Sequence, residues 1–194
     1  FGLIYNKTPQ MFIAFFLTST YMTYYSIINK IPRTLKVLQG MINSAVLPFA
    51  VSLDTLHHYK ERRELFLRGT RYSFLFLTPV VVFAIFYAED ILKLWIGENY
   101  MFLANLLRAY VGWQYLNFFI SFGSSMYTHV EHFRYILPYS TLGSGLFLLF
   151  MGIFMERLKL WAVLLGLLLS SCIVIPSNII LIKKINKFSL YEFF

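Results

Sequence analysis

Acidic residues are scarce in this chain: there are nine among 194 residues, and none lies inside a long apolar segment. All of them lie in polar connections or at the ends of apolar segments, at Asp54, Glu61, Glu64, Glu89, Asp90, Glu98, Glu131, Glu156 and Glu192. No paired carboxylates, Ser/His/Asp set or glycine-rich phosphate loop stands out, so the sequence offers no recognisable machinery for catalysis. We therefore expect a protein that is not an enzyme.

Cysteine is almost missing as well. Cys172 is the only one, which excludes a disulfide within the chain and most metal-binding frameworks. Because it lies in an apolar run, we expect a buried structural thiol there. We also expect no metal site and no cofactor.

Charged residues of both signs make up only 13% of the chain, against 58% hydrophobic residues, and the mean hydropathy is +0.64. Soluble proteins have about 25% charged residues. The polar surface is too small to cover a soluble globule, so the sequence predicts an integral membrane protein. The 17 basic residues give a net charge of +8, but apolar segments separate them, and we expect no nucleic-acid partner.

Four apolar segments are long enough to cross a membrane as helices, which takes about 20 residues; they are 66–88, 101–127, 135–154 and 160–182. The residue-by-residue alternation of a membrane barrel is absent. The first 53 residues allow two arrangements. The first has helices at 11–28 and 37–53 around a loop at 29–36. The second has a partial helix at 3–17 and one long helix at 20–51, bent at Pro32 and Pro48.

The distribution of basic residues favours the second arrangement. Cytoplasmic loops collect Lys and Arg, and the turn after residue 52 is crowded with them. Alternating spans place most other loop bases on the same side, and a loop at 29–36 would put three bases on the opposite side. The expected fold is therefore an all-α polytopic transmembrane bundle with about five full spans and a partial first one.

Three bases within the long helix form a stripe: Lys30, Arg33 and Lys36. At about 100° per residue they fall within roughly a third of the helix circumference. A fourth cation, Arg108, lies one or two turns into the span at 101–127. Because no predicted span contains an acid, we expect these four cations to lack a carboxylate partner at membrane depth and to bind an anionic substrate. The alternative is that their side chains extend to the lipid headgroups.

Several motifs resemble bacterial polysaccharide flippases. Tyr24-Tyr25-Ser26-Ile27 followed by Lys30-Ile31-Pro32 is similar to the start of the eighth helix of those proteins. Arg68-Gly69-Thr70-Arg71-Tyr72 and Pro79 resemble the following loop and ninth helix, and Leu106-Leu107-Arg108 the opening of the tenth. The most specific match is the connector Ile91-Leu92-Lys93-Leu94-Trp95-Ile96-Gly97.

This resemblance is to the O-antigen and capsule repeat-unit flippases of the multidrug/oligosaccharidyl-lipid/polysaccharide exporter superfamily. It implies two six-helix lobes around a central cavity, of which this chain would be the C-terminal lobe, with the N-terminal lobe missing. It also implies an undecaprenyl-diphosphate-linked oligosaccharide as substrate, moved across the bacterial inner membrane for surface polysaccharide or lipopolysaccharide biosynthesis. The alternatives are a cation-coupled multidrug antiporter, which would need an acid within a span, a membrane enzyme of glycan assembly, or a non-transporting membrane subunit.

Overall fold

The computed structural model of the chain describes residues 2–55, 59–126 and 130–186. These residues form seven α-helices and one 3-10 helix, and they contain no strand, which confirms the predicted all-α bundle. The elements are α1 (Gly2–Phe16), α2 (Ser19–Thr55), α3 (Tyr59–Phe86), α4 (Ala88–Trp95), η1 (Glu98–Leu103), α5 (Ala104–Met126), α6 (Val130–Leu158) and α7 (Leu160–Asn186). Glu192, one of the nine acidic residues of the sequence, lies outside these described ranges.

The segment for which the sequence left two arrangements is a single helix, α2, of 37 residues. It follows a tight turn after α1, in which the Tyr21 amide donates to the Thr18 carbonyl at 3.0 Å. Pro32 and Pro48 both lie inside the helix. Proline has no N–H and therefore removes one bond of the helical ladder at each position. At about 1.5 Å per residue, α2 is roughly 55 Å long and carries Lys30, Arg33 and Lys36 within its first half.

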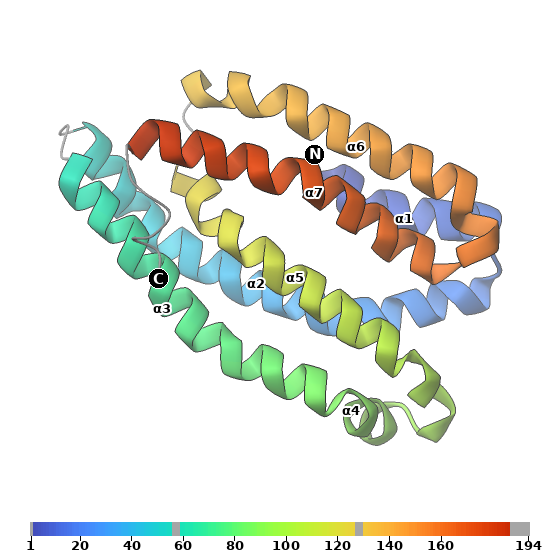
Figure 1. Cartoon of the computed structure of the whole chain (residues 1–194). Helices are drawn as coiled ribbons and strands as arrows, with labels where there is room; N and C mark the ends of the chain where they lie inside the picture. The colour runs from blue at the N-terminus through green and yellow to red at the C-terminus, as the bar shows by residue number, and fades with distance from the viewer. Residues whose placement is uncertain (1, 56–58, 127–129, 187–194) are drawn as a thin grey trace.

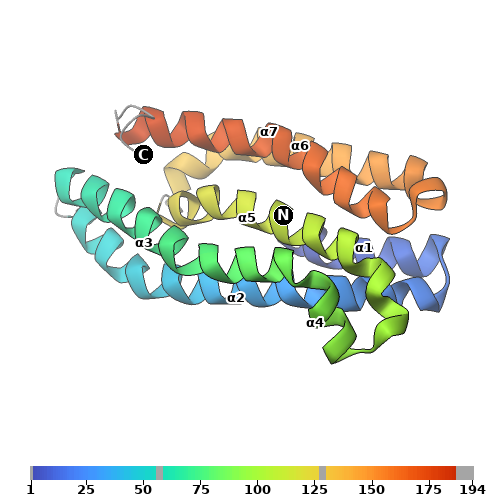
Figure 2. The same ribbon diagram turned by 60° about the horizontal axis from the view of Figure 1, so that its bottom comes forward.

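The long helices run alongside one another from end to end of the molecule (Figure 1). Helices α6 and α7 form a hairpin on one side, α2 and α3 lie on the other, and α5 packs between them against α2, α3 and α7 (Figure 2). The short α1 contacts α6, α2 and α7. Its Tyr5 hydroxyl forms hydrogen bonds with Ser170 of α7 (2.6 Å) and Ser144 of α6 (3.1 Å), which attach α1 to the hairpin.

A connector of α4 and η1 joins α3 to α5 at the end of the bundle where the α1–α2 and α6–α7 turns also lie (Figure 1). Gly97 ends α4 with φ of 108°, a conformation that residues with a Cβ rarely adopt. Its amide donates to the carbonyls of Leu92 and Lys93. An ion pair of 2.6 Å between Lys93 and Glu98 then joins α4 to η1. This ion pair joins two of the four charged side chains of the connector.

Large apolar side chains cover the outside of the bundle as well as its core. Phe147 and Met151 of α6 and Leu107 of α5 are fully buried, whereas Leu75 and Phe86 of α3 are about three-quarters exposed. Cys172 is also exposed, so the expectation of a buried thiol is wrong; its neighbours Ser170 and Ser171 take the buried positions on α7 instead. An apolar exterior of this kind is suited to lipid rather than water.

Three helical segments within the described part of the chain are long and apolar enough to cross a membrane by length and composition: Leu67–Phe86, Leu137–Leu158 and Leu160–Ile180. Helices α2 and α5, with 37 and 23 residues, are also long enough. Both of these helices carry polar side chains that line a cavity.

Candidate functional site

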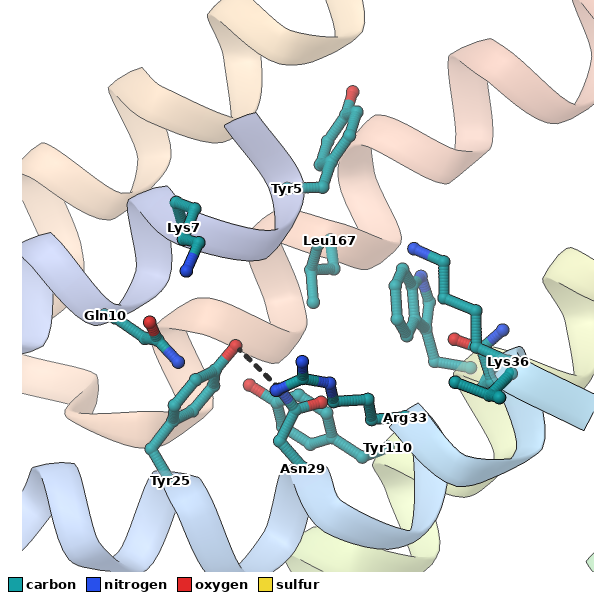
Figure 3. Close-up of a pocket in the computed structure, with 12 residues that line it drawn as sticks. Tyr5, Lys7, Gln10, Tyr25, Asn29, Arg33, Lys36, Tyr110 and Leu167 are labelled. Carbon is teal, nitrogen blue, oxygen red and sulfur yellow. Dashed lines mark hydrogen bonds between the residues drawn. The ribbon is translucent and has the colours of Figure 1, made fainter. Parts of the chain in front are cut away.

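A cavity of about 350 Å³ lies between α1, α2, α5 and α7 (Figure 3). This volume is within the range of small-molecule sites. Its lining combines cationic, amide and aromatic side chains: Tyr5, Lys7, Gln10, Tyr25, Asn29, Arg33, Lys36, Val37, Tyr110, Trp113, Gln114 and Leu167. No acidic residue is among them.

Three cations line this cavity: Lys7 of α1, and Arg33 and Lys36 of α2. In Figure 3, Lys7 approaches from α1 and Arg33 from α2, on opposite sides of the same space. Within the described residues, neither Lys7 nor Arg33 has an ion pair with a carboxylate. Several like charges around a partly enclosed space create a positive potential that attracts anions.

The face of α2 that lines the cavity contains two of the three stripe residues. Tyr25, Asn29, Arg33 and Lys36 follow one another at spacings of four, four and three, so they share one side of the helix. Lys30 is exposed and is not part of the lining. At about 100° per residue, its direction differs from that of Asn29 by roughly a quarter-turn, which takes it to the edge of this face.

Arg108 lies elsewhere, at the connector end of α5, and it is not part of the cavity lining. Its guanidinium donates to the Ile85 carbonyl (3.1 Å), to Asn105 Oδ1 (2.8 Å) and to Glu89 Oε1 (3.0 Å). The prediction that Arg108 lacks a carboxylate partner is therefore wrong. The reason is that the turn after α3 places Glu89, at the start of α4, beside the first turns of α5.

We expect the Arg108–Glu89 pair to contribute little to stability. The two side chains are 31% and 50% exposed, so water screens their attraction. In a double-mutant cycle of Arg108→Gln and Glu89→Gln, measured by unfolding in mixed micelles, the coupling free energy should be about 0.2–1 kcal/mol. A coupling above about 2 kcal/mol would contradict this and would indicate a pair shielded from water.

Uncharged polar groups form the remaining polar part of the lining. Asn29 Nδ2 donates to the Tyr25 hydroxyl at 3.4 Å, a long hydrogen bond (Figure 3). The Tyr110 hydroxyl is buried and has no hydrogen-bond partner within the described residues. Gln114 is also buried, at the α5 side. This part of the cavity therefore has unused hydrogen-bonding capacity but no charge.

Lys7, which contributes the third cation, is a site residue that the sequence patterns did not predict. It lies within the partial helix expected at 3–17, and only the packing of α1 against α2 and α7 brings it to the cavity. One signal was present: Lys7 and Gln10, three residues apart, place two polar side chains on one face of the helix.

Comparison with known proteins identifies a family. A family profile described as "Polysaccharide biosynthesis protein" matches residues 2–105, more than half of the chain. This region includes α1, α2 and α3, and hence all three cations of the cavity. No curated protein and no solved structure matches the chain.

Proposed function

The chain belongs to the polysaccharide biosynthesis protein family, and on that basis we propose that it is a membrane transporter of a lipid-linked oligosaccharide. In this proposal it spans the bacterial inner membrane several times and moves an undecaprenyl-diphosphate-linked repeat unit from the cytoplasmic to the outer leaflet. The family and the three apolar helices support a membrane protein of polysaccharide biosynthesis. The substrate and the direction of movement are the proposed part.

The cationic cavity is the observation that carries this proposal. A diphosphate has several anionic oxygens, which Lys and Arg bind through charge-assisted hydrogen bonds. Lys7, Arg33 and Lys36 reach one space from two helices, and the described residues that line this space include no acid. Cations are costly within the hydrocarbon depth of a membrane and are usually kept for a function. An anionic headgroup passing through the cavity would compensate that cost.

The same proposal assigns the opposite wall of the transport path to a further six-helix lobe, the N-terminal one that the resemblance implies. A lining drawn from four helices of one bundle provides one side of a path between two lobes. Movement of a headgroup across the membrane requires the cavity to open to each side in turn. The cations then bind the headgroup at an intermediate stage of this movement.

The lining also favours transport of an anion over cation-coupled drug export. A coupling cation needs an acid at the binding site. The lining residues of the described cavity include three bases and no acid. A drug antiporter would therefore have to place its coupling site outside this cavity.

A transport measurement tests the proposal directly. The chain, together with the N-terminal lobe that the proposal requires, is reconstituted into liposomes that contain a fluorescent undecaprenyl-diphosphate-linked oligosaccharide in both leaflets, and the fraction protected from an added membrane-impermeant quencher is followed over time. We expect the protected fraction to fall at a rate that increases with the amount of protein. A rate equal to that of protein-free liposomes would contradict the proposal.

A further inference from the structure

The two sides of the cavity differ in charge. Its three cations all come from α1 and α2, whereas α5 contributes only Tyr110, Trp113 and Gln114, which are uncharged. Trp113 and Gln114 lie three and four residues after Tyr110, so they flank it within about 100° of the circumference of α5. We call them the α5 wall. A ligand with an anionic and a neutral part would have a different partner on each side.

Hydrogen bonding fixes the orientation of Trp113 within the α5 wall. Its indole N–H donates to the Ser171 hydroxyl of α7 at 2.9 Å, and that hydroxyl donates to the Leu167 carbonyl at 2.8 Å. Because the only polar atom of the indole is already bonded, the ring offers the cavity an apolar aromatic surface. This surface lies beside the Gln114 amide, which can both donate and accept hydrogen bonds.

The polar groups near the α5 wall are buried and incompletely bonded. Tyr110 is 1% exposed, and its hydroxyl has no partner among the described residues. In the described part of the chain, the Tyr25 hydroxyl has only the long hydrogen bond from Asn29. Buried polar groups in proteins are nearly always bonded to protein, water or a ligand. A molecule rich in hydroxyl groups would supply the partners that these groups lack.

From these observations we propose that the α5 wall binds an uncharged sugar ring, the one attached directly to the diphosphate of the lipid-linked substrate. A sugar ring has an apolar face of C–H groups, which suits the Trp113 ring, and hydroxyls at its edge, which suit Gln114 and Asn29. The cavity is only about 350 Å³, so a sugar at this wall lies next to the phosphates held by the cations. This inference rests on the proposed function. It adds that the cavity recognises the sugar next to the diphosphate, while the cations recognise the diphosphate itself.

The test compares two lipid probes on the full chain in detergent: undecaprenyl diphosphate, and the same lipid diphosphate carrying one N-acetylglucosamine, which is uncharged. In a Trp95→Phe/Trp161→Phe background, Trp113 is the only tryptophan and its fluorescence reports binding. We expect the lipid with the sugar to bind about tenfold more tightly than the lipid without it. Gln114→Met, which removes the amide at similar size, should bring the two affinities to within about twofold, mainly by weakening the binding of the lipid that carries the sugar.

Two further variants test whether the preference for the sugar arises at the α5 wall. Trp113→Leu, followed by calorimetry, should also remove the preference for the sugar. Tyr115→Phe is the matched control on the same helix, because the Tyr115 hydroxyl bonds Thr78 of α3 at 2.8 Å instead of lining the cavity, and it should keep the preference. Equal binding of both lipids to the unsubstituted protein would overturn the α5 inference alone. Binding of neither lipid would overturn the proposed function together with it.

Discussion

Replacing Arg33 with Glu should reduce glycan export by about 100-fold or more. The substitution places a carboxylate among Lys7 and Lys36 at the site proposed for a diphosphate. Arg33 is exposed in the described bundle, and loss of a hydrogen bond to a charged group costs about 1.5–3 kcal/mol, where each 1.4 kcal/mol is a tenfold change in affinity. Charge reversal adds repulsion to this loss. Export is measured as surface polysaccharide in a strain whose only copy of the gene carries the substitution.

Lys30→Glu is the matched comparison for this experiment. It makes the same change of charge on the same helix, three residues away. Both side chains are exposed, but only Arg33 lines the cavity. We expect it to reduce export by less than about threefold, since a charge that does not line the cavity acts on the ligand only as an exposed pair does, by about 0.5 kcal/mol or less. Membrane levels of both variants are compared by immunoblot. Similar losses in the two variants would show that the cavity is not the site at which the anion binds.

The second large effect concerns the packing of α6 on α7. A Cβ added at Gly143 would lie 2.8 Å from Val174 Cγ2 and 2.9 Å from Ser170 Oγ, both in α7. Both distances are well below ordinary van der Waals contact. Gly143→Leu should therefore separate the hairpin and destabilise the protein by about 3 kcal/mol or more. We expect a large drop in the temperature of unfolding in detergent and a low yield of folded protein.

The same helix provides the control. Gly145 lies two residues further along α6, and a Cβ added there meets nothing within 4 Å. Gly145→Leu gains helix propensity without a clash, so its unfolding temperature should be equal to or slightly above that of the unsubstituted protein. If Gly143→Leu were as stable as Gly145→Leu, the close approach of α6 and α7 at Gly143 would be incorrect.

The helical fold could be predicted because its signals are local. Apolar segments longer than about 20 residues, with no alternation, allow only helices in a membrane. The choice of one long helix at α2 followed from the positions of Lys30, Arg33 and Lys36 relative to the bases of the following turn. The short α4 and η1 were expected only as a connection, since eight and six residues are too few for a clear periodic pattern.

The site was less predictable because it depends on contacts between distant helices. Helical spacing identified Arg33 and Lys36, but it could not show that the cavity face of α2 is centred nearer to Asn29 than to Lys30. Lys7 required the packing of α1, and the bond from Arg108 to Glu89 required the fold of the connector. Each of these facts depends on which helices pack against one another. The sequence pattern of a single helix does not carry that information.

The connection between α6 and α7 determines where this protein can accept added sequence. It is the single residue Lys159, at φ of 52°, and its amide and carbonyl are both used, in bonds to Met155 (2.9 Å) and from Ala162 (3.1 Å). Because no other residue connects the two helices, an epitope or reporter enzyme inserted there would break both hydrogen bonds and separate α6 from α7. The residues around Asn99, in the short 3-10 helix η1 where the side chain is exposed, are the better position for a tag that maps which side of the membrane this end occupies.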